Sequence, residues 1–372
     1  MEITLNQKTR QILHCLDTDA RMPFSEIAKR TRQSQETVRY TINRLKEEKI
    51  ISGTITVINI QALGYIPLQI LLKFQFLHEK KKEEIIAQVR EMPAVNWIGN
   101  LEGNYDLGII LSMKDYAQLH QLTGDIYRAC GEHLMKKRIS INLEGNYLPR
   151  DYLTNKERHT TKTADYAPTT FVSIDDVDKR ILHALAKDAR TSVVEIAKQT
   201  HMTPTAVIHR MKRLKENNII TKHLLLLNQE KLGQEHYKIL LFTNNQDKII
   251  SIIQKAYANK NVIAIIKTLA EWDLEIDLEV MSRQEVTRFM MGLSAEFSTI
   301  IRDYDILRIR DMPKYNFYPE KQTLNTTIAD KRKRSNICLA PSKREMENLK
   351  VLRPRRGRPR NGQEGRTEGV ST

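Results

Sequence analysis

The sequence predicts an α+β protein made of two copies of one composite unit, followed by a basic tail. Three observations predict it. The stretch from Gln11 to Ile51 recurs without a gap as Arg180 to Ile220, so that Asp188 lies 169 residues after Asp19. In each copy, apolar residues first recur at helical spacing and then alternate as in strands. After Pro319 both periodicities are lost. Copies this far apart are domain-sized units, because solenoid repeats have much shorter periods.

Each copy begins with three short predicted helices. In the first copy, apolar residues at helical spacing form three groups, which are Ile12/Leu13/Leu16, Phe24/Ile27/Ala28 and Val38/Ile42/Leu45. The third helix has a predicted cap in both copies, since Ser34 precedes it in the first copy and Thr203, followed by Pro204, precedes it in the second. Three apolar stripes predict one small shared core in each copy.

The third helix has a polar outward face, which differs between the copies. In the first copy the cap and this face comprise Ser34, Gln35, Glu36, Thr37, Arg39, Tyr40, Asn43, Arg44 and Lys46. In the second copy they comprise Thr203, Thr205, Ile208, His209, Lys212 and Arg213. Arg, Asn and Gln can form paired hydrogen bonds to base edges. A charged helix face is more often only solvated, but a third helix after a short turn favours the DNA-reading helix of a helix-turn-helix. Because the two faces differ, we expect an asymmetric DNA site.

Strand-like segments follow the helices. Ser52 to Asn59 alternates β-branched residues and predicts a strand or wing that could touch DNA phosphate or the minor groove. In the next strand-like segment, five apolar residues share one face, which predicts a half-buried strand. They are Leu68, Ile70, Leu72, Phe74 and Phe76.

The complete order of predicted elements is strand, helix, strand, strand, helix, strand. In the first half these are Ile66–Phe76, Lys81–Glu91, Val95–Leu101, Asp106–Leu111, Asp115–Met135 and Arg138–Leu143. In the second half they are Tyr237–Phe242, Lys248–Tyr257, Val262–Leu269, Leu274–Val280, Ser282–Ile300 and Asp305–Arg310. This β-α-β-β-α-β order is ferredoxin-like.

These patterns divide the chain into six segments. They are winged helix-turn-helix 1 (1–60), ferredoxin-like domain 1 (61–147), a linker (148–173), winged helix-turn-helix 2 (174–229), ferredoxin-like domain 2 (230–319) and a disordered basic tail (320–372). The linker is polar and rich in Thr. Its length would let the two halves pair within one chain.

Each half resembles the leucine-responsive regulatory protein (Lrp)/AsnC family of transcription regulators. The resemblance rests on DARMPFSEIAK and DARTSVVEIAK, on VRYTINRLKEEKIISG and VIHRMKRLKENNIITK, and on LEGNYDL opposite LAEWDL. It covers nearly all of Leu5 to Tyr147 and Ile174 to Tyr318. It implies a winged helix-turn-helix that binds double-stranded DNA, and a ferredoxin-like domain that forms dimers and binds small effectors, commonly amino acids. Here the halves would form a built-in pseudo-dimer, alone or within a larger homo-oligomer.

The resemblance also implies an effector site beside a turn between two strands. The matching residues are Gly103, Asn104, Tyr105 and Asp106 in the first half and Trp272 and Asp273 in the second. A Gly can adopt positive φ there, and a carboxylate beside backbone donors could orient an amino group. An ordinary hairpin that binds nothing explains the same residues equally well. In the second half Ala270 replaces the Gly, which weakens the expectation there.

The tail carries most of the excess positive charge. The chain has a net charge of +15 at pH 7, and Lys321 to Thr372 contains 14 Lys/Arg against 5 Asp/Glu. Within it lies an AT-hook-like run, Arg355, Arg356, Gly357, Arg358, Pro359 and Arg360. Arginines that flank a small Gly suit the narrow minor groove of A·T tracts. A solvated basic tail that attracts any polyanion is the alternative.

Other chemistry is weakly indicated. Cys15, Cys130 and Cys338 form no CxxC pair, which favours a reducing cytoplasm, where the protein would associate with the nucleoid. No apolar run is long enough to cross a bilayer. The sequence has no Walker-type loop, GxSxG or HExxH motif. We therefore expect no catalytic residue, no metal site, no cofactor and no membrane partner.

The sequence thus predicts a sequence-specific DNA-binding transcriptional regulator, modulated by a small metabolite such as an amino acid. Two alternatives remain open. Siroheme decarboxylases share the paired fold, and such an enzyme would need a tetrapyrrole pocket where basic residues meet carboxylates. An architectural nucleoid protein with low sequence specificity would depend mainly on the tail for its affinity.

Overall fold

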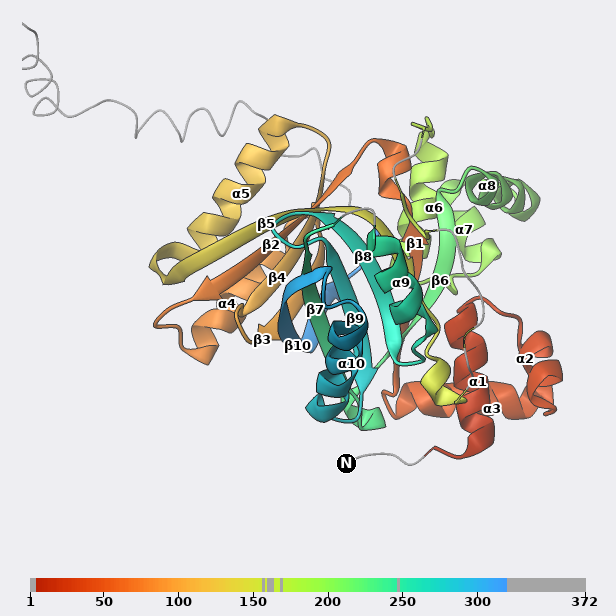
Figure 1. Ribbon diagram of the computed structural model, residues 1–372. Coiled ribbons are helices and arrows are strands. Elements are labelled where there is room, and N and C mark those ends of the chain that lie inside the picture. The colour runs from red at the N-terminus through yellow and green to blue at the C-terminus, as the bar shows by residue number, and fades with distance from the viewer. Residues whose placement is uncertain (1–4, 156–157, 159–163, 168–169, 246–247, 320–372) are drawn as a thin grey trace, which may run out of the picture. The chain divides into compact units, whose positions relative to one another are not determined.

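The computed structural model describes residues 5–155, 158, 164–167, 170–245 and 248–319 (Figure 1). The AT-hook-like run and the rest of the predicted basic tail lie outside the described residues. Parts of the predicted linker lie outside them as well.

Two sets of three helices form where the repeat predicts them. They are α1 (Gln7–Thr18), α2 (Phe24–Thr31) and α3 (Gln35–Glu47) in the first half, and α6 (Asp176–Lys187), α7 (Val193–Thr200) and α8 (Pro204–Glu216) in the second. Ser34 caps α3 by accepting a hydrogen bond from the Thr37 amide at 3.0 Å. Thr203 caps α8 in the same way, and Pro204 is its first residue. Both predicted caps are confirmed.

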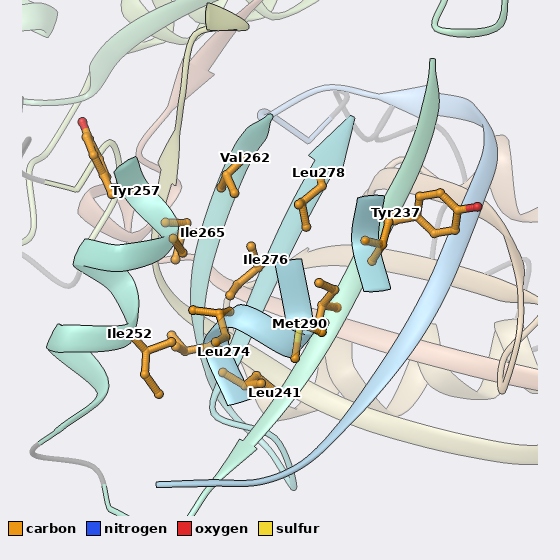
Figure 2. Packing of buried hydrophobic residues seen from close by; sticks show 14 of the residues in the cluster. Tyr237, Leu241, Ile252, Tyr257, Val262, Ile265, Leu274, Ile276, Leu278 and Met290 are labelled. Carbon is orange, nitrogen blue, oxygen red and sulfur yellow. The ribbon is translucent and has the colours of Figure 1, made fainter. Parts of the chain in front are cut away.

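Both halves contain the ferredoxin-like order of elements. The first half has β2 (Ile66–Phe74), α4 (Glu79–Arg90), β3 (Val95–Glu102), β4 (Leu107–Met113), α5 (Tyr116–Cys130) and β5 (Leu134–Tyr147). The second half has β7 (Glu235–Thr243), α9 (Ile249–Ala258), β8 (Val262–Leu269), β9 (Leu274–Val280), α10 (Arg283–Glu296) and β10 (Ile301–Tyr315). Figure 2 shows the core of the second half, where Ile252 of α9 and Met290 of α10 pack against sheet residues such as Ile276.

The two sheets join into one closed barrel with the strand order β10-β3-β4-β2-β5-β8-β9-β7. The joins lie between the halves, because β5 pairs with β8 and β10 pairs with β3. The last strand of each half extends beyond its predicted end, to Tyr147 instead of Leu143 and to Tyr315 instead of Arg310. These extensions pair with strands of the other half, so no local pattern predicts them. Helix α5 ends at Cys130 and not at the predicted Met135, which lies in β5.

The strand predicted from Ile66 forms as β2, but it is buried on both faces, so the predicted half-burial is wrong. Leu68, Ile70 and Leu72 pack in the core beneath α4 and α5. Leu71, on the opposite face, is also fully buried and packs in a second cluster between the two sheets. Phe76 does not belong to the strand, since its φ is +50° and its side chain is 89% exposed.

The strands after the helices pair with each other. β1 (Ile51–Ile58) and β6 (Ile220–Leu227) form a two-stranded antiparallel sheet, in which Thr56 lies opposite His223. The strand predicted for a wing therefore forms, but most of its residues are buried against the second half. Ser52 is its exposed residue, close to the strand start.

Each of these strands completes the helical core of the other half. Ile58, together with Ala62 and Leu63 just after β1, packs with α6, α7 and α8. Leu225 and Leu227 of β6 pack with α1, α2 and α3. The two helical units therefore exchange part of their cores.

Candidate nucleic-acid interface

Helix α3 presents the predicted polar face to solvent. Its exposed residues are Gln35, Glu36, Thr37, Arg39, Tyr40, Asn43 and Lys46. Arg44 is half-buried, with its Nε 3.7 Å from a Glu48 carboxylate oxygen. The Arg39 guanidinium lies 5.9 Å from the centre of the Phe24 ring on α2, so one side of it is supported by the protein. The Ser34 and Thr37 hydroxyls bind each other at 2.8 Å and serve the cap.

Helix α8 also exposes its predicted face, but its arginines are held by the protein. The exposed residues are Thr203, Thr205, Ile208, His209, Lys212 and Arg213. Arg213 donates a hydrogen bond to Asp178 at 2.6 Å. Arg210 donates to the same carboxylate at 2.9 Å and to Asp175 at 2.7 Å. In the first half, Thr9 stands at the position that corresponds to Asp178. No carboxylate there can therefore bind an arginine of α3.

The two helix-turn-helix units contact each other reciprocally. Arg21 donates hydrogen bonds to the carbonyl oxygens of Ala189 and Thr191, the latter at 3.0 Å. Arg190 donates to the carbonyl oxygen of Ala20 at 2.6 Å. These residues belong to the repeated Asp-Ala-Arg sequence, so the same residue types lie on both sides, as in a two-fold interface. Together with the β1–β6 pairing, these contacts fix α3 relative to α8.

The carboxylates at the predicted effector turns bind the protein itself. Asp106 accepts hydrogen bonds at 2.8 Å from both the Lys73 ammonium and the Phe74 amide. In the second half Asp273 accepts from the Thr243 amide at 2.7 Å and from its hydroxyl at 2.8 Å. These contacts join each turn to the neighbouring strand, which is a structural role. A ligand-binding role for the turns stays a prediction.

The other turn residues contact the opposite half or the barrel interior. Gly103 has a φ of +132°, and a Cβ there would lie 3.1 Å from the Ile306 carbonyl oxygen on β10. Asn104 donates to Asp305 at 2.5 Å. Tyr105 and Trp272 are both buried in the cluster between the sheets, and the indole N–H of Trp272 donates to Glu275 at 3.0 Å.

A connected set of charged side chains, none of which belongs to a predicted site, lies inside the barrel. Lys238 donates at 2.8 Å to both Glu275 and Asp277. His236 Nε2 lies 3.3 Å from Asp277. Burial alone would raise the pKa of Asp277, but the charge of Lys238 and the contact with His236 hold it below its usual value. The signal was available, because Glu275, Asp277 and Glu279 alternate along β9 and so share its inner face.

The described residues show few other features of a chemical site. Cys130 is buried, and desolvation raises the pKa of its thiol to about 11. Within the described ranges, no group of three or more His, Cys, Asp or Glu is placed to hold a metal ion. No helix in the described part of the chain is long and apolar enough to cross a membrane.

Comparison with known proteins identifies the family. The AsnC-type helix-turn-helix domain matches residues 5–46 and again residues 174–215. An uncharacterised HTH-type transcriptional regulator of Pyrococcus furiosus is 31% identical over 122 residues, which cover 33% of this chain and 82% of that relative. The chain belongs to the Lrp/AsnC family. A further relative of this Lrp/AsnC protein is the HTH-type transcriptional regulator FL11 of Pyrococcus furiosus, which is 26% identical over 117 residues, 32% of this chain and 78% of the relative.

A solved structure resembles this Lrp/AsnC protein over most of its length. The crystal structure of the siroheme decarboxylase NirDL matches with a TM-score of 0.56 and 16% sequence identity, and the match covers 84% of this chain and 94% of that chain. At this level of identity the similarity establishes the fold alone. Two helix-turn-helix units on a duplicated α+β fold are therefore the architecture of the Lrp/AsnC chain described here.

Proposed function

We propose that this Lrp/AsnC transcription regulator reads an asymmetric DNA site as an intramolecular pseudo-dimer, under the control of a small metabolite and without catalytic activity. The observation that carries the proposal is the combination of reciprocal contacts with unequal exposed faces. Arg21 and Arg190 hold the two helical units in one arrangement, while α3 and α8 expose different side chains. Such a pair would read two different half-sites in successive major grooves, about 34 Å apart.

The exposed residues suggest that the two recognition helices make different kinds of contact with DNA. Gln35, Arg39 and Asn43 of α3 have the side chains that pair with base edges. In α8, Ile208 suits a thymine methyl group and Lys212 suits a phosphate. Since Asp178 engages Arg213, we expect α3 to contribute more of the sequence choice.

The metabolite and the assembly are parts of the same proposal. Effector binding by the turn residues 103–106 and 272–273 remains a proposal, with an amino acid as the expected ligand. The closed barrel within one chain supports a monomeric pseudo-dimer, because both sheets already have their partner strands. Association between whole chains would then be additional to the pairing of the two halves within one chain. The protein would act on the chromosome in the cytoplasm.

Binding to fragments of the organism's own genome tests the proposal. The full chain and a truncation after Pro319 would be compared at several salt concentrations with mixed-sequence competitor DNA. We expect the truncated protein to select a discrete asymmetric footprint with lower affinity. If the truncated protein no longer selects a discrete DNA site, the result would instead favour the architectural nucleoid protein. Replacing Arg356 and Arg358 should weaken binding to A·T tracts more than to G·C tracts if the run is an AT-hook.

The similarity to NirDL keeps a siroheme decarboxylase-like activity as the second candidate. The similarity in fold over 84% of the chain is the observation in its favour. The polar exposed faces of α3 and α8 favour the regulator, because an enzyme has no need of them. Titration with siroheme, followed by its absorbance, separates the two. A saturable spectral shift followed by loss of carbon dioxide would establish the enzyme.

A further inference from the structure

Two guanidinium groups lie against the ring of Phe24, the first residue of α2. The Arg39 guanidinium of α3 lies 5.9 Å from the ring centre, and the Arg190 guanidinium of the second helix-turn-helix unit lies 4.7 Å from it. Both distances are within the range of about 6 Å in which an aromatic ring attracts a cation. One ring therefore connects a side chain of the first recognition helix with the second helical unit.

The position of the Phe24 ring is fixed by its neighbours. The ring is half-buried and packs against the core of the first helical unit. Arg190 is itself anchored, because it donates hydrogen bonds to the carbonyl oxygens of Ala20 at 2.6 Å and Met22 at 3.3 Å. An arginine that stacks on a fixed ring loses less conformational freedom when it binds DNA, because its planar group is already oriented.

Arg39 differs from the other arginines of α2 and α3 in its surroundings. Arg30 pairs with Glu26 at 2.7 Å, and Arg44 lies 3.7 Å from Glu48. Arg39 is exposed, and among the described residues no carboxylate pairs with it. It is the fifth residue of α3, and the residues near the N-terminus of a recognition helix are those that contact base edges. Arg39 is therefore placed to read a base.

The duplication supplies a comparison for the contact between Arg39 and Phe24. Ile208 of α8 corresponds to Arg39, and Val193, the first residue of α7, corresponds to Phe24. The half with an arginine on its recognition helix thus has an aromatic ring beside it, and the half with an aliphatic residue has an aliphatic neighbour. Because the second helical core accepts Val at this position, core packing does not by itself require an aromatic ring there.

We propose that Arg39 reads a guanine in the half-site of α3, and that Phe24 is the positioning residue that gives Arg39 this preference. The inference rests on the proposed function and names one base of its DNA site. Arginine selects guanine because two of its N–H groups donate to O6 and N7 in the major groove. Both hydrogen bonds form only when the guanidinium plane is correctly oriented, which the ring of Phe24 ensures. Ile208 has no donor, so the half-site of α8 has no guanine preference at the equivalent position.

Selection of sites from randomised DNA by the full chain tests the base that Arg39 reads. Kd is then measured for all four bases at each position of the selected site. We expect guanine at one position to bind at least about fivefold more tightly than any other base, the lower limit for a paired arginine contact. Arg39→Met should abolish the preference at that position and leave the preferences at the other positions unchanged.

Three other results of this selection would contradict the proposal in different ways. If Arg39→Met weakens binding to all sequences equally and lowers the salt slope by about 0.9, Arg39 contacts a phosphate and the proposal is overturned. A selected site that Arg39→Met reads with unchanged base preferences would refute this inference alone. Failure of the unsubstituted chain to select any site would refute the proposed function together with it.

Substitutions of Phe24 test its positioning role. Phe24→Leu removes the aromatic face but keeps an apolar side chain, and should lower the guanine preference about two- to fivefold, the value of an exposed cation–π contact. Phe24→Tyr keeps the ring and should preserve the preference. Val193→Leu, at the equivalent position of the second half, is the matched control and should alter neither half-site. An equal loss of affinity for all four bases in Phe24→Leu would show a structural role only.

The second half allows the reverse experiment. Ile208→Arg combined with Val193→Phe transfers the pair to α8, where Arg21 stands at the position that corresponds to Arg190. We expect the double variant to prefer guanine at the equivalent position of the α8 half-site, and Ile208→Arg alone to show a weaker preference. Equal preferences in the single and double variants would overturn the role of the ring.

Discussion

Asp178 holds Arg213 through a hydrogen bond of 2.6 Å between its Oδ2 and the Nη2 of the arginine. The carboxylate is fully buried beneath α8 and also accepts from Arg210. In the first half Thr9 takes the place of Asp178, so Arg44, the counterpart of Arg213, lacks this partner. The duplicated helices therefore differ in how strongly their arginines are retained by the protein, as well as in their exposed side chains.

Replacement of Asp178 by Thr, the residue of the first half, should release Arg210 and Arg213 toward DNA. Each new phosphate contact makes the plot of log K against log salt steeper by about 0.9. We expect a slope steeper by about one to two units and tighter non-specific binding at low salt, measured by fluorescence anisotropy. The conformational stability should fall by about 1–3 kcal/mol, because hydrogen bonds to a charged group are lost.

The reverse substitution supplies the control for Asp178. Thr9→Asp introduces a carboxylate beside α3, where Thr41 replaces Arg210. It should destabilise the protein, since the buried carboxylate could meet only Arg44, the counterpart of Arg213, and no second arginine. A salt slope that stays the same in Asp178→Thr would show that these arginines do not reach DNA even when released.

Arg190→Ala should loosen the contact between the two helix-turn-helix units. It removes hydrogen bonds to Ala20 and Met22 and the cation–π contact with Phe24, where the guanidinium lies 4.7 Å from the ring centre. We expect a loss of about 1–3 kcal/mol in urea unfolding, since buried carbonyl groups lose their donor. Arg21→Ala should behave similarly because the contacts are reciprocal.

The effect of Arg190→Ala on DNA binding is measured with DNA sites that differ in the spacing of their half-sites. The unsubstituted chain should discriminate strongly against a site whose half-sites are moved apart by two base pairs, and Arg190→Ala should discriminate less. Lys198→Ala, on the exposed side of α7, is the control. If Arg190→Ala keeps the same spacing preference, the β1–β6 pairing alone fixes the two helices.

Acid should weaken the pairing of the two halves through His223. Desolvation lowers the pKa of this histidine to about 4 in the folded protein, where its Nδ1 lies 2.9 Å from the Thr56 hydroxyl. Between the unfolded pKa near 6.5 and the folded value, the unfolded chain binds the proton and the folded chain does not. Stability therefore falls as the pH falls through this window, by about 2 kcal/mol between pH 7.5 and pH 5.

Urea unfolding of the His223→Gln variant at these two pH values measures that contribution. The variant should lose correspondingly less stability on acidification than the unsubstituted chain. His209→Gln, at an exposed position on α8, should keep the full dependence. An identical pH dependence in His223→Gln and the unsubstituted chain would contradict the assignment.

Substitutions at Asp106 test whether its turn has only a structural role or also binds an effector. Asp106→Ala leaves the Phe74 amide without its acceptor and should cost about 1–3 kcal/mol. Asp106→Asn keeps an acceptor oxygen and should cost less. If the turn binds an amino acid, both variants should abolish the thermal shift that a panel of amino acids produces. A shift that survives in Asp106→Asn would leave the turn with its structural role only.

The sequence was most informative where structure is local. Helix spacing and the caps at Ser34 and Thr203 depend on neighbouring residues, and the structure confirms them. The repeat and the DAR motifs also predicted the family, which the comparisons bear out. The alternation along β2 revealed a strand but not its burial, since the second sheet that covers Leu71 is remote in sequence.

The missed features depend on contacts between distant segments. The last residues of β5 look like the end of a domain, although they pair with β8. A cavity lined by His236 also has walls from the first half, at Trp97 and Tyr147, so no local motif marks it. The acidic residues of β9 alternate with apolar residues in the sequence. That they face inward follows only from the closed barrel.

After a duplication, one of the two copies can ordinarily accumulate damaging mutations without loss of function. Here Ile58 fills the core of the second helical unit and Leu225 fills the core of the first. A mutation that ruins either copy thus removes side chains that the other needs, and selection on one copy protects both. The two halves can diverge on their surfaces, as α3 and α8 have done, but neither can be lost.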